Sequence, residues 1–329
     1  MPKNYSLGHL NVIVADLPAD HHVEVLRVAA VAAAADAEEA AVVVVAKPKH
    51  TVGIGWRPQI ASFILENSDL IHDLEILVEN FYKLSNKDIK TLRFLDTLFD
   101  LHFHSVGLGI CGSEGIPKRE LKKYKKFFSL FSIESWSDHF SFVRSGGIEL
   151  GHLAAPSWND ETINITLKNL KHAKNELGHI PALENISTLL YPPLSTYSET
   201  DWMKSILLSG GQSMLLDINN IYCNAMNFKL DPFQELDRYP FDHVTQIHMS
   251  GGKWIQFESD LHMLDDHKQD IPEIGFQMLK FALSKLTHPV SIIIERDGNY
   301  PASAILKQQL IRIHQLINEK DAPIELFSI

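Results

Sequence analysis

The sequence predicts an α/β fold, a closed TIM (β/α)8 barrel preceded by an extension outside the barrel. From residue 51 onwards, short apolar runs alternate with amphipathic segments, and this alternation repeats eight times. The apolar runs are rich in β-branched residues, as expected for parallel strands that are buried on both faces. An open, doubly wound sheet is the alternative, but no GxxxxGK[ST] phosphate-binding turn supports it.

Each of the eight units combines a strand pattern with the helical pattern that follows it. The third helical pattern is rich in lysine, and a long loop separates the fourth strand from its helix. In chain order, the predicted pairs are 51–56 with 58–65, 74–81 with 87–99, 101–110 with 118–131, 132–137 with 161–177, 181–187 with 199–209, 213–219 with 231–238, 243–249 with 272–286, and 291–297 with 302–318.

Residues 1–50 differ from the rest and are expected to form an N-terminal extension, which leaves 51–329 for the barrel. Within them the run 29–45 is low in complexity: its Ala/Glu part favours a helix, whereas its four consecutive valines favour a strand. A segment packed on the outside of the barrel and a poorly ordered tail are both consistent with this composition.

Composition limits the class of protein and its partners. The chain has 329 residues, of which 45% are hydrophobic and 22% charged, as in an ordinary globular protein. Its 41 acidic and 30 basic residues give a net charge of −11, which argues against nucleic acid or an anionic membrane as a partner. No apolar run is long enough to span a bilayer, and the first residues lack the features of a secretory signal. Cys111 and Cys223 are too few for a disulfide framework, so a cytoplasmic location is expected.

Polar side chains recur at the carboxyl ends of six predicted strands. In a barrel these ends surround one mouth, where active sites are built from several strands. Burying so many acids without compensation would be prohibitive, so bound cations are implied. The candidates, in strand order, are His104, Asp138, Glu184 with Asn185, Asp217 with Asn219 and Asn220, His248, and Glu295.

The stretch from Gln246 to His267 is the clearest part of this pattern. His248 ends an apolar, strand-like segment, and Asp265 and His267 occupy alternate positions of LDDH. If LDDH is extended, both side chains point the same way, as metal ligands would. The alternative is that His248 is a core histidine and LDDH a solvated loop.

The expected ligands are nitrogen and oxygen atoms without sulfur. Such sites suit iron, manganese or zinc, and two histidines with one carboxylate and open positions are typical of oxygen-activating non-haem iron. The candidates outnumber the roughly four to six ligands of one ion, so two or more metals are predicted.

Other residues have a structural explanation beside the functional one. Asp138 belongs to SWSDHFSF, whose aromatic residues could be core packing, and Arg296 could form a salt bridge with either neighbouring acid. His152 and Arg57 either contact substrate or cap local structure. Asn185 and Asn220 are expected to hydrogen-bond to ligands. The helix around 118–126 is either a solvated face or a surface for an acidic partner.

Seven motifs resemble a known family when they are taken in order and spacing. FHSVGLGICG, SWSDHFSF, LENIS, LLDINNIYCNA, IHMSGG, LDDH and IIERDGNYP resemble the multinuclear non-haem iron-dependent oxidative (MNIO) enzymes, which include the iron subunit of methanobactin synthase. The resemblance covers about residues 52–317 and implies a TIM barrel akin to xylose-isomerase-like and endonuclease-IV-like metal enzymes. It also implies two or three irons, with dioxygen as the co-substrate that oxidises a Cys or a C-terminal acidic or amide residue of a ribosomally made peptide. A small partner protein that captures the leader of this precursor peptide is a further implication.

Carried over residue by residue, the resemblance assigns catalysis to His104, Asp217 and His248, and metal binding to His104, Asp138, Glu184, Asp217, His248, Asp265, His267 and Glu295, with Asn220 as a further candidate. Two departures stand out. Leu77 occupies the place of a histidine two residues before an EN pair, and Asp138 replaces the glutamate of an SEH motif.

The sequence therefore predicts an iron- and O2-dependent oxidative enzyme acting on a peptide, with zinc or manganese as substitute metals. A redox-inert metal barrel, either an isomerase or a phosphodiesterase, is the first alternative. The second is a non-catalytic binding protein that keeps the barrel, and Leu77 is the residue that supports it.

Overall fold

The computed structural model describes residues 3–7, 10–14, 50–83, 85–131, 133, 136–257 and 260–321. The chain divides into two units, Met1–Lys47 and Pro48–Ile329. In the first unit, strands β1 (Lys3–Leu7) and β2 (Leu10–Val14) pair antiparallel. The low-complexity run 29–45 lies outside the described residues, so its helix and strand alternatives stay predictions.

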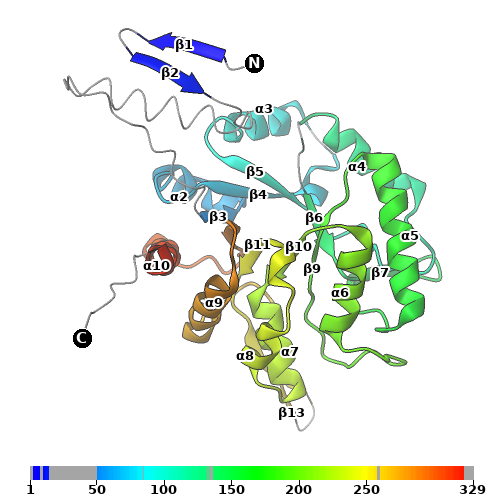
Figure 1. The fold of residues 1–329 in the computed structure, drawn as a ribbon. Coiled ribbons are helices and arrows are strands. Elements are labelled where there is room, and N and C mark those ends of the chain that lie inside the picture. Colours follow the sequence, from blue (N-terminus) through cyan, green and yellow to red (C-terminus); the bar gives the residue numbers. More distant parts are fainter. Residues whose placement is uncertain are drawn as a thin grey trace. The chain divides into compact units, whose positions relative to one another are not determined.

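The second unit contains a closed barrel of eight parallel strands (Figure 1), which confirms the predicted fold and excludes the open sheet. Neighbouring strands follow one another in chain order, and the last pairs with the first through Ile292 and Val52. The strands are β3 (Thr51–Gly55), β4 (Asp73–Leu77), β5 (Asp100–His104), β6 (Trp136–His139), β9 (Ala182–Glu184), β10 (Met214–Asp217), β11 (Val244–Met249) and β14 (Ser291–Ile294).

Helices connect the strands and surround the barrel (Figure 1). Several begin at capping side chains: Ser85 and Asn159 form capping boxes, and Ser198 accepts a hydrogen bond from the Asp201 amide. The helices are η2 (Pro58–Ile60), α2 (Ala61–Glu66), η3 (Val78–Phe81), α3 (Asn86–Leu95), α4 (Lys118–Phe128), α5 (Asp160–Leu177), α6 (Glu199–Gly210), α7 (Ile218–Phe228), α8 (Pro232–Asp237), η4 (Phe241–His243), α9 (Glu273–Lys285) and α10 (Ser303–Asp321). None of the helices in the described ranges is long and apolar enough to cross a membrane.

Two antiparallel hairpins extend the loops at the carboxyl ends of barrel strands. Strands β7 (Phe142–Ser145) and β8 (Ile148–Ala154) follow β6, and β12 (Lys253–Phe257) and β13 (Asp260–Leu264) follow β11. Both hairpins therefore lie on the side of the barrel where the predicted site residues are found.

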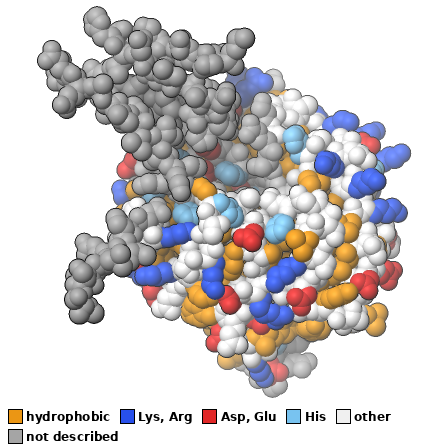
Figure 2. Space-filling model, in the orientation of Figure 1, with side chains coloured by type: hydrophobic (Ala, Val, Ile, Leu, Met, Phe, Trp, Pro, Cys, Tyr) orange, Lys and Arg blue, Asp and Glu red, His pale blue; other side chains and the backbone are white. Residues whose placement is uncertain are grey.

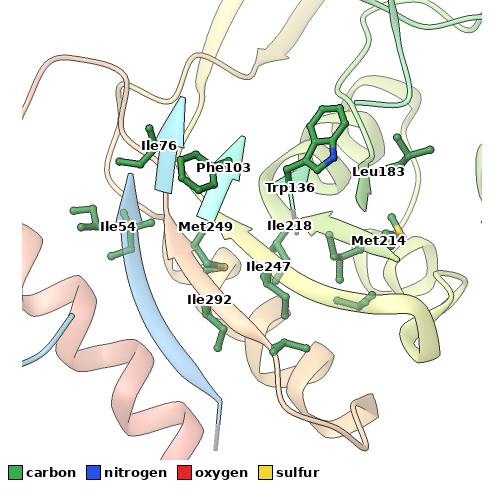
Figure 3. Close-up of a cluster of buried hydrophobic side chains, with 14 of the residues drawn as sticks. Ile54, Ile76, Phe103, Trp136, Leu183, Met214, Ile218, Ile247, Met249 and Ile292 are labelled. Atoms are coloured by element: carbon green, nitrogen blue, oxygen red, sulfur yellow. The ribbon is translucent and has the colours of Figure 1, made fainter. Parts of the chain in front are cut away.

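Alternation along the strands separates an apolar outer layer from a polar interior. Ile54, Ile76, Phe103, Ile247 and Ile292 are buried and belong to the cluster of Figure 3. Successive strand residues point to opposite faces, so the neighbours of these side chains in sequence point into the barrel. These inward positions include one acid and three histidines, whereas an ordinary barrel interior is dominated by branched apolar residues. The four residues are Glu75, His102, His104 and His248.

Two elements differ from the prediction. Strand β6 (Trp136–His139) runs past the predicted end at residue 137, so Asp138 lies inside the strand and not after it. An unpredicted helix, α7, starts directly after β10, because the Asp217 carboxylate accepts the Asn220 amide as an N-cap. An acid before INNIYCNAMNF is the sequence signal that could have revealed this helix.

Candidate metal centre

Three overlapping groups of side chains that could bind metal ions occupy the carboxyl end of the barrel. Within each group, one ligand atom per residue lies within 4.8 Å of the others. The groups contain six of the eight predicted ligands but neither Asp138 nor Asp265. They are His104, His139 and Glu184; Glu184, Asp217, His248 and Glu295; and His267, Glu295 and Asp297.

In the first group, two imidazoles face one carboxylate. The Nε2 atoms of His104 and His139 lie 3.6 and 3.1 Å from Glu184 Oε2. Nδ1 of His139 lies 3.1 Å from the Ser105 carbonyl oxygen, to which it can only donate, so Nε2 keeps its lone pair. Nδ1 of His104 is held 2.8 Å from Ser137 Oγ. Both rings are therefore oriented with Nε2 towards Glu184.

The second group centres on His248, which is buried at the end of β11. Its Nδ1 lies 3.3 Å from Glu184 Oε1 and 3.1 Å from Glu295 Oε2. Its Nε2 lies 2.7 Å from Oε2 of Glu75, an acid on β4 that the sequence reasoning missed. Gln246 Nε2 donates to the same Glu75 oxygen at 2.8 Å. The signal for Glu75 was a charge inside an otherwise apolar strand run, two residues before Leu77.

The third group forms at the rim, where His267 meets the end of β14. His267 Nδ1 lies 3.2 Å from Glu295 Oε2 and 3.6 Å from Asp297 Oδ2. Arg57 Nε donates to Asp297 Oδ1 at 3.0 Å. The arginine therefore neutralises part of the acidic rim and orders Asp297.

The LDDH segment is not extended as predicted. Strand β13 ends at Leu264, and His267 has a left-handed backbone with φ of 50°. Asp265 and His267 nevertheless face each other, with Asp265 Oδ1 2.9 Å from His267 Nε2. A turn rather than strand alternation brings them together, and Asp265 also accepts from Asn219 Nδ2 at 2.6 Å.

Burial and neighbouring charges shift the pKa values of these side chains in opposite directions. Burial, with Asp265 and Glu184 nearby, raises the pKa of Asp217 well above its ordinary value. Burial favours neutral His248, but Glu75, Glu184 and Glu295 outweigh it and raise the pKa of this ring well above 6.5. Burial likewise opposes ionisation of Glu295, yet His267 and His248 hold its pKa well below the usual range. The negative charges of these carboxylates are balanced only while the histidines are protonated, or when a bound cation takes the place of those protons.

The donor set fits metal ions. Glu184 Oε2, Asp217 Oδ2 and His248 Nδ1 are buried and have no hydrogen-bond partner among the described residues. Orphaned buried polar atoms are costly, and all three belong to the first two groups. Nitrogen and oxygen donors of this kind suit iron, manganese or zinc. Neither cysteine belongs to the groups.

Asp138 lies behind the first group instead of in it. Its carboxylate accepts from Ser105 Oγ at 2.6 Å, from the His139 amide at 2.7 Å and from the Leu108 amide at 3.3 Å. Burial raises its pKa to about 7. Adjacent strand residues point to opposite sides, so the side chain that faces Glu184 is that of His139. The sequence named the pair Asp138-His139 but could not tell which member faces the interior.

Two asparagines join the loops that carry the acids. Asn185 accepts from the Asp217 amide and donates to the Asp217 carbonyl, both at 2.9 Å. Asn220 Nδ2 donates to the Asn185 carbonyl at 3.0 Å. These bonds hold the ends of β9 and β10 in register beside the second group.

The remaining predicted residues lie around the mouth. Arg296 donates to Asp270 at 3.1 Å and to the Gly298 carbonyl at 2.9 Å. Its ion pair is therefore with Asp270 and not with the adjacent Glu295 or Asp297 of the structural alternative. His152 is exposed on β8, outside the three groups. Leu77 is the register partner of His104, so an apolar side chain stands at the level of the first group.

Proteins of similar sequence match most of this chain. A UPF0276 protein of Acinetobacter baylyi is 26% identical over 262 residues, covering 80% of this chain and 89% of the relative. A UPF0276 protein of Shewanella loihica is 28% identical over 265 residues, covering 80% and 93%.

Solved structures show the fold alone. A D-tagatose 3-epimerase-like protein superposes with a TM-score of 0.54 at 16% identity, covering 83% of this chain and all of that one. A xylose isomerase domain protein from Planctomyces limnophilus gives 0.52 at 13% identity, covering 83% and 99%. These similarities confirm the expected xylose-isomerase-like barrel.

A family model decides the assignment. The model for the RiPP precursor modification enzymes MbnB/TglH/ChrH matches residues 51–318, which include every barrel strand and all three groups. This match confirms the resemblance read from the seven motifs. The chain belongs to the MbnB/TglH/ChrH family of RiPP precursor modification enzymes.

Proposed function

We propose that this protein is an iron- and O2-dependent enzyme that oxidises a Cys or a C-terminal Asp or Asn residue of a ribosomally made precursor peptide. The observation that carries the proposal is the sharing of carboxylates between the three groups: Glu184 belongs to the first two and Glu295 to the last two. Each shared carboxylate could offer an oxygen to an ion on either side, so the arrangement supports more than one ion.

Residues at different depths of the barrel mouth have different proposed roles. His104, His139, His248 and His267 supply nitrogen ligands, and Glu184 and Glu295 supply shared oxygens. Iron bound there would supply the one-electron and dioxygen chemistry. Leu77 offers no ligand atom beside His104, so a metal held by the first group would have no protein ligand from this position of β4. Arg57 and Asp297, at the rim, are placed to orient a peptide entering the mouth.

Partners and location follow from the same proposal. The family description names a precursor as the substrate, which supports a peptide rather than a sugar or a nucleic acid. A small protein that binds the leader is proposed as a second partner. Both cysteines are free and buried, which is compatible with the proposed cytoplasmic location.

A redox-inert barrel that uses zinc, manganese or magnesium is the competing function, because the nitrogen and oxygen donors suit these metals too. Metal analysis of anaerobically purified protein, followed by oxygen uptake with a candidate peptide, separates the two. The candidate peptide would be one that contains Cys, Asp or Asn and is encoded by a short open reading frame beside the gene for this protein.

We expect two or three irons per chain and peptide-dependent oxygen consumption that His248→Ala abolishes. Fewer than one iron per chain, with turnover supported by zinc or magnesium alone, would establish the redox-inert enzyme. No metal above background would establish the non-catalytic binding protein.

A further inference from the structure

Helix α4 has a face of cations that is unusual in this acidic chain. The segment 118–126 carries six cations and one acid, whereas the whole chain has a net charge of −11. All six are exposed, while Leu121, Tyr124 and Phe127 on the opposite side are buried against the barrel. Figure 2 shows Lys and Arg side chains along the right-hand edge, where Figure 1 places α4 and α5.

Three of these cations form a stripe without internal partners. Lys118, Lys122 and Lys126 are spaced by four residues and therefore lie on one side of the helix. None of them makes an ion pair with another described residue, whereas Arg119 and Lys123 pair with Glu149 and Glu120. Unpaired cations at regular spacing are available to an external anion.

A cavity of about 670 Å³ adjoins this stripe at the carboxyl end of the barrel. Arg119 and Lys123 of α4 form one wall, and Arg144 and His152 of the β7–β8 hairpin form another. The loop after β5 contributes Gly107. A chain lying along the stripe would therefore enter a hollow at the rim of the barrel.

The cavity is connected to the first ligand group through a single loop. Arg144 is only 7% exposed, and its Nη1 and Nη2 donate to the carbonyls of Leu108 and Gly107 at 2.8 and 2.7 Å. The Leu108 amide in turn donates to Asp138, the neighbour of His139. The cations of the hollow are themselves paired, Arg119 and Arg144 with Glu149 and Lys123 with Glu120. One loop thus separates this hollow from the candidate metal ligands.

We propose that the stripe Lys118–Lys122–Lys126, beside this cavity, binds an acidic segment of a polypeptide. That this segment belongs to the precursor peptide rests on the proposed function. That the stripe prefers an acidic segment does not. Four helical residues advance about 6 Å. Two residues of an extended chain advance about 6.6 Å. The stripe therefore matches acidic residues at alternate positions of an extended peptide.

Duplex nucleic acid fits this surface less well. The stripe advances only about 12 Å along one helix. Beyond the stripe the chain has an excess of acids, 41 against 30 basic residues, so a long anionic ligand would run onto a repulsive surface. A phosphate backbone would meet repulsion beyond the helix, whereas a short acidic peptide segment would not.

The test is a fluorescence anisotropy titration of the full, metal-free chain at low salt. The probe is a labelled peptide with three Asp residues at alternate positions in a Gly/Ser background. Comparison peptides carry three consecutive Asp residues, or three alternate Asn residues. We expect the alternate-Asp peptide to bind at least about fivefold more tightly than either, and binding to weaken as salt is added.

Lys122→Glu with Lys126→Glu should weaken binding at least about tenfold, because two attractions become repulsions. The matched control reverses two exposed lysines of α5, Lys168→Glu with Lys171→Glu, and should change affinity less than about twofold. Equal loss in both double variants, or no loss in either, would overturn the proposal. So would duplex DNA or anionic vesicles binding more tightly than the peptide.

The anisotropy titration involves neither metal nor turnover. The protein could therefore bind the acidic peptide without showing iron-dependent oxidation, or show the oxidation without binding the acidic peptide. If the α4 variant keeps iron content and oxygen uptake with a peptide but loses affinity for acidic segments, the surface acts in recognition alone. A variant that loses iron as well would contradict the separation of this surface from the metal centre.

Discussion

The pairing of Glu75 with His248 shows how one buried acid can set the state of a ligand. Glu75 Oε2 lies 2.7 Å from His248 Nε2, while Nδ1 of the same ring faces Glu184 and Glu295. A carboxylate behind a histidine fixes its tautomer and makes the opposite nitrogen a stronger ligand. Glu75 would therefore act on a metal bound by His248 through this ring, as a positioning residue.

Glu75→Gln is predicted to weaken metal binding by about 10- to 100-fold, the usual effect of changing such an outer partner. The amide keeps the size of the side chain but removes the charge that favours Nε2–H. A chelator-competition titration with iron(II) under anaerobic conditions measures the change.

The control for this substitution is Glu199→Gln. Burial raises the pKa of Glu199 to about 8, and this residue belongs to none of the three groups. It should leave metal affinity unchanged. Equal affinities for wild type and Glu75→Gln would show that Glu75 does not position His248.

At the scale of elements, the barrel interior holds a second polar cluster one level below the metal centre. Asp73 of β4 accepts hydrogen bonds from Thr51 and Ser291 of the neighbouring strands. Its Oδ1 lies 3.5 Å from His102 Nε2 of β5. Gly53 lies opposite, and a Cβ there would come within 2.6 Å of the Asp73 carbonyl, so only glycine lets β3 and β4 approach this closely.

This cluster predicts a pH-dependent contribution to stability. Burial favours neutral His102, but Asp73 outweighs it and raises the pKa of His102. Burial opposes ionisation of Asp73, but His102, Ser291 and Thr51 lower its pKa. The His102 contribution is complete below the unfolded pKa of about 6.5 and is lost as pH rises through the raised folded value. The Asp73 contribution is complete above about 3.9 and is lost as pH falls through its lowered value.

His102→Gln should therefore lower the free energy of unfolding most between about pH 4 and 6.5, by about 1–2 kcal/mol. The difference from wild type should shrink at more alkaline pH. Urea unfolding curves at a series of pH values provide the measurement. His179→Gln, at an exposed histidine, is the control and should give a small difference that does not vary with pH. A His102→Gln difference that is constant with pH would contradict the ion pair.

At the scale of the whole molecule, closure of the barrel concentrates like charges that repel one another. Glu184, Asp217 and Glu295 come from β9, β10 and the end of β14, yet they belong to one group with His248. Bringing buried acids together costs stability unless protons or cations compensate. The folded barrel and the bound metal should therefore stabilise each other.

Metal binding should raise the melting temperature of the chain. At a free metal concentration of about 100 times Kd, one site adds about 2.7 kcal/mol, which corresponds to several degrees for a protein of this size. Calorimetry with chelator and with anaerobic iron(II) measures the shift. His248→Ala should reduce it strongly, and a melting temperature that is the same in both conditions would contradict the linkage.

The sequence by itself determined the barrel, its strand order and most of the acids and histidines at its mouth. Apolar runs alternating with helical patterns admit few topologies, and a charged residue that ends a buried strand is visible without a structure. Six of the predicted ligands, among them His104 and Glu184, could be named in this way.

Only the tertiary structure decided which neighbour faces the interior and which residues converge from distant strands. The expected fourth strand ended at residue 137, whereas β6 includes both Asp138 and His139, and the period of two points only His139 towards Glu184. Glu75 and Asp297 join the site through barrel closure and rim contacts, and the turn at His267 replaces the expected extension. These outcomes depend on register and on long-range contacts between strands, which short stretches of sequence do not encode.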